Sequence, residues 1–352
     1  MVDSVGPPRK VVVGAAMFAM WGPYPGLEKR LQELCGFVDE MAAQARSRHG
    51  RGLDLAALPE VAVTGGLPLG PEGAVPLEGA VRDAFAATAR RHACHIVVPL
   101  VLRETPALAT NACVLLDRGG EVLGIYRKVH VVAAYDGDLL ENGTAPGRDF
   151  PVFQTDFGRV GIQICWDIAY DDGWETLARK GAEVVVWSTQ SPGQINAACR
   201  AWSHGYFVLT STWRHNASLL DPTGHRIACI TRPEERVLVE EIDLAYRIVG
   251  WQPGLDSGRA LGERYGERVG YRYSEAEDHG IFWSNDPATP VDAMLRALDL
   301  TTTADGKVEH DRRLQDAARG GPPLADAVPL NPGATLPGSA GWREYWGAAL
   351  KG

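Results

Sequence analysis

The chain has 352 residues, enough for one large domain or two modest ones, and its 45% hydrophobic composition can supply a buried core. It holds 35 Lys and Arg against 44 Asp and Glu, and the formal net charge of −9 disfavours a surface for nucleic acid. No uninterrupted apolar run reaches about 18 residues, so we expect no membrane-spanning helix.

Six cysteines are spread widely along the chain without the close spacing of a CxxC motif. This spacing predicts free thiols in a reducing compartment, and we expect a cytoplasmic protein. Arg9 and Lys10 before the apolar residues 11–20 could imitate a secretory signal, but the same residues fit a first core strand better.

Short β-rich apolar runs alternate with helical patterns over the first 245 residues, which is typical of helices that cover a sheet. Apolar residues recur every three or four positions over residues 27–45 and again around Val81, Phe85 and Ala89, and a third helical pattern covers 174–180. We expect strands at residues 10–19, 53–58, 95–102, 113–117, 122–126, 160–164, 183–188, 207–211, 217–220 and 237–243.

Two turn sequences, Asp117-Arg-Gly-Gly and Asp221-Pro-Thr-Gly, each stand between two strand-like runs and predict hairpins. Because hairpins pair antiparallel strands, the sheets are expected to be mixed rather than purely parallel.

The pattern weakens towards the C-terminus, where only residues 291–300 still predict a helix and residues 320–341 are dense in Pro and Gly. We expect one domain over residues 9–245 and an irregular C-terminal extension over 246–352 without a core of its own. The extension is expected to pack on the core or on a neighbouring subunit, with a latch that includes Trp342 and Trp346.

Chemistry-bearing residues stand at the ends of three strand-like runs. Residues 160–164 lead to Cys165, although a cysteine is most often a small buried hydrophobe. Glu60 follows a proline at the end of another apolar run. Burying half of a carboxylate there costs free energy, which predicts either a functional role or a paired group. A third run ends in Arg127 and Lys128, and a solvated strand end would explain either cation alone.

Together, Glu60, Lys128 and Cys165 resemble in order and spacing the nitrilase superfamily of carbon-nitrogen hydrolases. The resemblance covers residues 11–243 and includes Leu58-Pro-Glu60, Tyr126-Arg-Lys128-Val-His130, Ala145-Pro-Gly147, Gly161-Ile-Gln-Ile-Cys165-Trp-Asp, Gly181-Ala-Glu-Val and Ser218-Leu-Leu-Asp-Pro-Thr-Gly224. It implies an α/β fold, namely a four-layer α-β-β-α sandwich, a Glu-Lys-Cys triad, and assembly as a homodimer or a larger homo-oligomer.

The resemblance also implies a role for each member of the triad. Glu60 is the general base that takes the proton of Cys165, whose thiol is otherwise mostly protonated at neutral pH, and Lys128 stabilises the negative charge of the intermediate together with a backbone amide near Trp166. Many relatives use a second glutamate between the lysine and the cysteine. Glu141 is our candidate for it, with Asp136 or Asp138 as alternatives.

The residues after the nucleophile bear on the substrate. The triplet Cys-Trp-Asp at 165–167 is similar to that of carbamoylated-polyamine amidases, which favours amides and ureido compounds over nitriles. We expect Trp166, Asp167, Trp187 and Trp213 to contact the substrate, and Asp167 to share an acidic rim with the neighbouring residues Asp171 and Asp172. The alternatives are solvated turns for the aspartates and core packing for the tryptophans.

We expect no metal and no cofactor, since the nine histidines lack HExxH and HxH spacing and no phosphate-binding glycine loop occurs. The sequence predicts a hydrolase of a small-molecule amide or N-carbamoyl group. The alternatives are a nitrilase acting on a nitrile, an acyltransferase that passes the thioester to an amine, and a catalytically silent scaffold of the same fold.

Overall fold

The computed structural model describes residues 5–133, 140–232, 234–252 and 254–300, together with Thr302, Gln315, Arg319 and Gly320. Nearly all of them belong to one compact unit, Ser4–Thr301. Four residues named above lie outside the described part, namely Asp136, Asp138, Trp342 and Trp346.

The first sheet has six strands, β1 Lys10–Ala16, β2 Leu55–Ala57, β3 His95–Thr105, β4 Leu108–Leu116, β5 Val122–Arg127 and β12 Val237–Asp243. Their order across the sheet is β12-β1-β2-β3-β4-β5. The central strands β1, β2 and β3 run parallel, whereas β12, β4 and β5 pair antiparallel with their neighbours. The bounds of β12 are the same as those that the sequence predicts for this strand.

The second sheet also has six strands, β6 Val152–Gln154, β7 Arg159–Ile164, β8 Val184–Thr189, β9 Phe207–Thr212, β10 Ser218–Leu220 and β11 Arg226–Cys229. Their order is β11-β10-β9-β8-β7-β6, and β7, β8 and β9 run parallel between antiparallel edges. Every residue of β8 and β9 is buried, which is typical of parallel strands covered on both faces. Both sheets are therefore mixed, as predicted.

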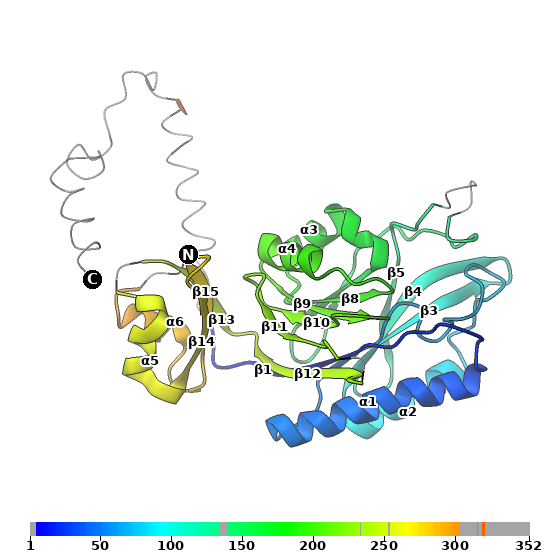
Figure 1. Cartoon of the computed structure of the whole chain (residues 1–352), viewed down its shortest axis with the longest axis horizontal. Helices are drawn as coiled ribbons and strands as arrows, with labels where there is room; N and C mark the ends of the chain where they lie inside the picture. The colour runs from blue at the N-terminus through cyan, green and yellow to red at the C-terminus, as the bar shows by residue number, and fades with distance from the viewer. Residues whose placement is uncertain are drawn as a thin grey trace. The chain divides into compact units, whose positions relative to one another are not determined.

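Helices cover the outer face of each sheet (Figure 1). The helices α1 Leu27–His49 and α2 Ala80–His92 pack on the first sheet, and α3 Asp172–Arg179 and α4 Gln194–His204 pack on the second. In β1, Val12 faces the helices while Val11 and Val13 face the second sheet, because successive side chains of a strand point to opposite faces. The four-layer α-β-β-α sandwich is thus confirmed.

Parallel strands of both sheets end at the same edge of the sandwich. Ser188, near the end of β8, donates a hydrogen bond to the carbonyl oxygen of Leu58 over 2.8 Å, and Ser211, near the end of β9, donates one to Ala16 over 2.7 Å. The strand β4 pairs antiparallel with both β3 and β5. The strand β5 therefore runs in the same direction as β3 and ends at this edge as well. The residues that follow β2, β5 and β7 are therefore brought together.

Residues 246–300 are more regular than the sequence predicts. The strands β13 Tyr246–Gly250, β14 Val269–Ser274 and β15 His279–Ser284 form a third sheet, accompanied by η2 Asp256–Gly258, α5 Arg259–Tyr265, η3 Gly266–Arg268 and α6 Val291–Arg296. Val249, Leu261, Phe282 and Met294 contribute to a core at this sheet, so the expectation of an irregular extension without a core is wrong for these residues. The strands β13 and β14 escaped detection because they are half-buried and mix aromatic residues with Gly and Arg. The strand β15 is mostly buried, but it is short and begins with His and Gly.

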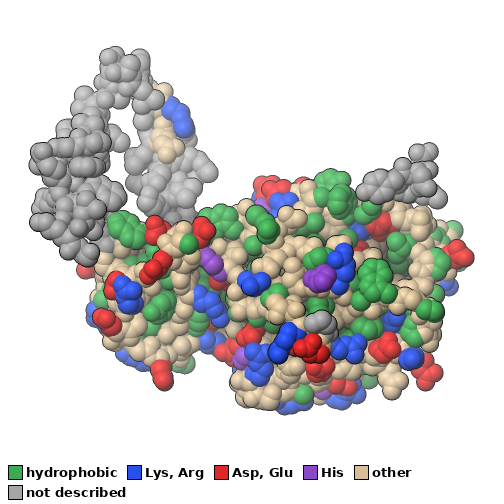
Figure 2. Space-filling view, in the orientation of Figure 1, with side chains coloured by type: hydrophobic (Ala, Val, Ile, Leu, Met, Phe, Trp, Pro, Cys, Tyr) green, Lys and Arg blue, Asp and Glu red, His purple; other side chains and the backbone are tan. Residues whose placement is uncertain are grey.

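Acidic and basic side chains intermingle on the face shown in Figure 2. In the described part of the chain many charged side chains pair across elements, for example Arg48 with Glu240 and Arg82 with Glu121, each over 2.8 Å. Of the helices in the described part of the chain, none is both long enough and apolar enough to cross a bilayer.

Candidate active site

Glu60, Lys128, Glu141 and Cys165 meet at the edge where the parallel strands end. Glu60 follows β2, Lys128 follows β5 directly, and Cys165 follows β7 as the first residue of the short 3-10 helix η1 Cys165–Ala169. The Lys128 ammonium lies 3.1 Å from Oε1 of Glu60 and also forms a hydrogen bond with Oε1 of Glu141. One buried cation thus holds two buried carboxylates.

Glu60 is 1% exposed, and its two oxygens differ in their surroundings. Its Oε1 accepts hydrogen bonds from Lys128 and, over 2.9 Å, from the side-chain amide of Asn111. Its Oε2 is buried and accepts no hydrogen bond from the described residues. The carboxylate is therefore fixed through one oxygen and has the other available to receive a proton.

The thiol of Cys165 belongs to the same cluster. Burial, and secondly the negative charge of Glu60, raise the pKa of this thiol to about 12, although Lys128 and Thr189 act in the opposite direction. The Cys165 thiol is therefore protonated at neutral pH, and it could act as a nucleophile only after a neighbouring base removed its proton.

Lys128 keeps its positive charge in spite of its burial. Burial lowers the pKa of the Lys128 ammonium, but the facing groups of Glu60, Cys165 and Glu141 outweigh this and raise the pKa overall. The site therefore contains a fixed cation next to the thiol, which is the group that a developing oxyanion requires.

Asn111 is a member of this cluster that the sequence analysis missed. It lies in β4, and its side-chain amide donates to Oε1 of Glu60 and, over 3.2 Å, to Oε2 of Glu141. The signal was an amide residue within an otherwise apolar strand, since a buried Asn needs hydrogen-bond partners. The predicted strand began at Cys113 and therefore did not include it.

Glu141 reaches the site from a loop. Besides Lys128 and Asn111, the backbone amide of Val132 donates to its carboxylate over 3.1 Å. The residue itself has a φ of +40°, and Thr144 donates a hydrogen bond to its carbonyl oxygen. The structure thus brings the preferred candidate for the second glutamate into contact with Lys128.

The backbone is strained at Cys165 and at the residue that follows Glu60. Cys165 has a φ of +44°, and Val61, directly after Glu60, has a φ of +50°. The left-handed region is unfavourable for any residue with a Cβ and most of all for a β-branched one such as valine. Residues held there against their preference cluster at functional sites, where the surrounding contacts fix them.

The structure corrects the predicted acidic rim. Asp167 is fully buried, and its carboxylate accepts hydrogen bonds from the Tyr126 hydroxyl over 2.7 Å, from the backbone amide of Ile164 and from His130. Asp171 pairs instead with Arg200 and His204, so the rim does not form. A buried carboxylate needs such partners, and those of Asp167 all lie inside the protein.

The three predicted pocket tryptophans are placed differently from one another. Trp166, next to the nucleophile, is 45% exposed, but Trp187 and Trp213 are buried. The indole N–H of Trp187 donates to the carbonyl oxygen of Cys165 over 3.1 Å, and that of Trp213 donates to the carbonyl oxygen of Glu60 over 2.9 Å. These two side chains therefore hold the backbone of the site instead of lining a pocket.

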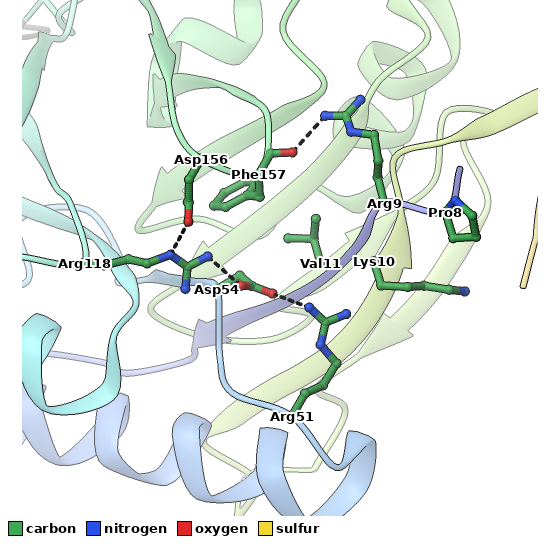
Figure 3. A pocket seen from close by; sticks show the side chains of 9 residues that line it. All are labelled: Pro8, Arg9, Lys10, Val11, Arg51, Asp54, Arg118, Asp156 and Phe157. Carbon is green, nitrogen blue, oxygen red and sulfur yellow. Dashed lines mark hydrogen bonds and ion pairs between the residues drawn. The ribbon is translucent and has the colours of Figure 1, made fainter. Parts of the chain in front are cut away.

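A cavity of about 520 Å³ lies elsewhere, at the amino ends of β1 and β2. Figure 3 shows Arg118 and Arg51 directed at Asp54 from two sides, and Arg9 directed at the carbonyl oxygen of Phe157. These charges are already paired with one another. The cavity is at the opposite end of the strands from Cys165, so we assign it no part in the chemistry.

No cluster of His, Cys, Asp and Glu among the residues that the structure describes could hold a metal ion.

Comparisons with known proteins identify the family and the fold. A family model described as carbon-nitrogen hydrolase matches residues 20–248. The omega-amidase of Xenopus tropicalis is 26% identical over 252 residues, which is 63% of this chain and 86% of that protein. A probable nitrilase of Schizosaccharomyces pombe is 27% identical over 149 residues, 38% of this chain and about half of its own length, 53%.

Among solved structures, an amidase from Nesterenkonia sp. superposes with a TM-score of 0.56 at 19% identity, over 68% of this chain and 92% of that one. At this identity the likeness supports the fold alone. The family match, in contrast, spans more than half of the chain. The chain therefore belongs to the carbon-nitrogen hydrolase family of the nitrilase superfamily, enzymes that act on non-peptide carbon-nitrogen bonds.

Proposed function

We propose that this enzyme is a cysteine-dependent amidase that hydrolyses the amide or N-carbamoyl group of a small molecule through a thioester. The observation that carries the proposal is the state of the Glu60 carboxylate. Lys128 and Asn111 bind its Oε1, whereas its Oε2 is buried without a hydrogen bond. The same carboxylate is close enough to the Cys165 thiol to raise its pKa. The name of the omega-amidase relative supports an amide as substrate.

In the first half of the reaction, Glu60 takes the proton of the Cys165 thiol while the sulfur attacks the substrate carbon. The electron pair of the carbonyl π bond moves to oxygen, whose negative charge Lys128 and the backbone amide of Trp166 stabilise. Glu60 then passes its proton to the departing nitrogen, which leaves as ammonia or an amine, and the thioester remains.

In the second half, Glu60 removes a proton from water, and the resulting hydroxide attacks the thioester carbon. The sulfur leaves as the thiol with the proton from Glu60, and the acid is released. Glu141 pairs with Lys128 throughout and keeps the ammonium directed at the reacting oxygen. The exposed Trp166 is the residue that we assign to contact with the rest of the substrate.

The test is ammonia release from a panel of primary amides, N-carbamoyl amines, N-carbamoyl amino acids and nitriles. We expect release from an amide or an N-carbamoyl compound by the native protein and by Cys199→Ala, whose cysteine is exposed and outside the site, but not by Cys165→Ala. Mass spectrometry of the native protein mixed rapidly with substrate should find the acyl group on Cys165.

Release from nitriles alone would overturn the proposal in favour of a nitrilase. Transfer of the acyl group to added hydroxylamine at the expense of hydrolysis would indicate an acyltransferase. Absence of turnover and of any acyl group on Cys165 would indicate a silent scaffold.

We also propose that the enzyme works in the cytoplasm as a homodimer or a larger homo-oligomer. All six cysteines are free, which supports a reducing compartment. Light scattering of the purified protein tests the assembly, and a monomer at micromolar concentration would contradict it.

A further inference from the structure

Trp187 holds the peptide that links Cys165 to Trp166. Its side chain comes from β8 and is 2% exposed, and its indole N–H donates to the carbonyl oxygen of Cys165 over 3.1 Å. The ring is backed by Gly193, where an added Cβ would lie 2.5 Å from the ring. The indole therefore has little freedom to turn away from this carbonyl.

The carbonyl group of Cys165 and the amide of Trp166 belong to one planar unit. In a trans peptide the C=O and the following N–H point in opposite directions, and the described part of the chain contains no cis peptide bond. Fixing the direction of the Cys165 carbonyl therefore also fixes the direction of the Trp166 N–H. The φ of +44° at Cys165 means that this orientation needs support, because the local backbone preference opposes it.

We propose that Trp187 is a positioning residue of the amidase reaction, whose indole holds the Cys165–Trp166 peptide so that the Trp166 N–H meets the oxygen that becomes negatively charged. The inference rests on the proposed function, since it assigns a donor for the intermediate of that reaction. In this role Trp187 acts through the peptide, by its hydrogen bond to the Cys165 carbonyl oxygen.

Two other tryptophans show what sets Trp187 apart. Trp174 donates its indole N–H over 3.0 Å to the carbonyl oxygen of Asp167, in the same short helix η1, and Trp213 donates to that of Glu60. All three bonds stabilise the backbone. Only the carbonyl bound by Trp187 shares its peptide with the amide next to the nucleophile, so only this bond can direct an oxyanion donor.

The experiment compares Trp187→Phe with the matched control Trp174→Phe. Each removes one indole N–H from a backbone carbonyl of η1 and keeps an aromatic ring. Two rates are measured, kcat with the best amide of the panel and alkylation of Cys165 by iodoacetamide, a displacement in which no oxyanion forms. We expect kcat of Trp187→Phe to fall between about tenfold and a hundredfold, less than the loss of a whole donor. Its KM and its alkylation rate should stay within about twofold, and Trp174→Phe should change neither rate.

Equal falls in turnover and alkylation in Trp187→Phe would show that the indole merely supports the thiol, and would overturn the inference. So would an unchanged kcat, or the same fall in Trp174→Phe. A circular dichroism spectrum and thermal midpoint for each variant separate these outcomes from misfolding.

An aldehyde tests the inference without any turnover of amide. Butyraldehyde adds to a thiol so that an S–C bond forms, the carbonyl π pair moves to oxygen, and the thiol proton ends on that oxygen through Glu60. Its affinity, measured as protection of Cys165 from iodoacetamide, should be about tenfold weaker in Trp187→Phe than in Trp174→Phe. Equal affinities would refute the inference even in a protein that releases no ammonia, whereas the absence of ammonia alone would refute only the proposed function.

Discussion

Glu60 affects Cys165 in two ways that act in opposite directions. In the proposed reaction its carboxylate is the base that removes the thiol proton, yet its negative charge, after burial, raises the pKa of the same thiol. The cysteine is thus kept protonated until a substrate is in place. This limits the reaction of the thiol with other electrophiles, because the thiolate is the reactive form.

The substitution Glu60→Gln separates these two effects. We expect turnover to fall by at least a hundredfold, as for other general bases, while the pH at which Cys165 reaches half of its maximal alkylation rate moves downward. The sign follows from the charge, because removing a nearby negative charge favours the thiolate. The measurement is iodoacetamide alkylation of Cys165 against pH, read by peptide mass spectrometry, alongside ammonia release.

Glu141→Gln is the control for this experiment. Glu141 acts on Lys128 but is not among the groups that shift the pKa of the thiol, so the midpoint of alkylation should stay in place. An upward move in Glu60→Gln would contradict the assignment.

The sequence predicted which residues meet at the candidate site better than it predicted the residues that support them. Glu60, Lys128 and Cys165 each follow a strand and carry functional groups that are costly to bury, so they stand out in an apolar context. Trp187 and Trp213 were noticed but were interpreted as pocket walls, since an indole can either line a pocket or bind a backbone carbonyl. Only the fold places these carbonyls within reach of the rings.

At the scale of elements, the buried carboxylate of Asp167 connects the strands that carry the lysine and the cysteine. It accepts hydrogen bonds from Tyr126, in β5, and from the backbone amide of Ile164, the last residue of β7. It also accepts bonds from the backbone and the ring of His130, two residues after Lys128. The separation between the two strand ends therefore depends on one aspartate.

His130 makes this connection sensitive to pH. The hydrogen bond to Asp167 raises the pKa of the His130 ring against the opposing effect of burial, and Asp172 acts in the same direction. Tyr170 stacks on the ring at 3.9 Å between centroids, and Phe150 lies at 6.0 Å. A raised pKa in the folded state means that the charged ring stabilises the fold fully below its unfolded pKa of about 6.5. This stabilisation disappears as the pH rises through the folded pKa.

We therefore expect His130→Gln to lower the thermal midpoint more at pH 5.5 than at pH 8.5. His95→Gln is the matched control, because burial is the main cause that lowers the pKa of the His95 ring. The contribution of His95 to stability therefore depends on pH in the opposite way and weakens as the pH falls. Differential scanning calorimetry at the two pH values measures both. A midpoint difference for His130→Gln that does not depend on pH would contradict the assignment.

The helices α1 and α2 were predictable because their apolar residues recur every three or four positions, and the central strands were predictable because they are short, continuous apolar runs. The exceptions are the helix α4 and two short edge strands, β6 Val152–Gln154 and β11 Arg226–Cys229, whose residues are mostly half-buried or exposed. An edge strand pairs with only one neighbour, so its amino-acid composition gives little indication that it forms a strand. In the third sheet, the edge strands β13 and β14 were missed for the same physical reason.

At the scale of the whole molecule, Asp54 connects segments that are far apart in the sequence. It lies just before β2 and accepts hydrogen bonds from the backbone amide of Val12 over 2.8 Å and from Arg118, in the turn between β4 and β5, over 2.6 Å. Arg118 in turn pairs with Asp156, in the turn between β6 and β7 of the other sheet, over 2.7 Å. The cluster of Figure 3 thus joins the two sheets at the end opposite to the thiol.

Asp54→Ala is expected to lower the free energy of unfolding by about 2 to 4 kcal/mol, because it leaves a half-buried guanidinium and a buried amide without their acceptor. Asp156→Ala, whose side chain is mostly exposed, should cost less than about 1 kcal/mol. Urea unfolding measures both values. Ammonia release by the folded fraction should remain as in the native protein, and a loss of turnover in the folded state would contradict the separation of the two ends.

The strand order of the first sheet has a consequence for synthesis on the ribosome. The strand β1 is complete at Ala16, but its antiparallel neighbour β12 begins only at Val237. At about 5 to 20 residues per second, the apolar edge of β1 waits for tens of seconds before its partner leaves the exit tunnel. The nascent chain therefore carries an unpaired, aggregation-prone edge through most of translation, and slow growth at low temperature or extra chaperone should raise the yield of folded enzyme.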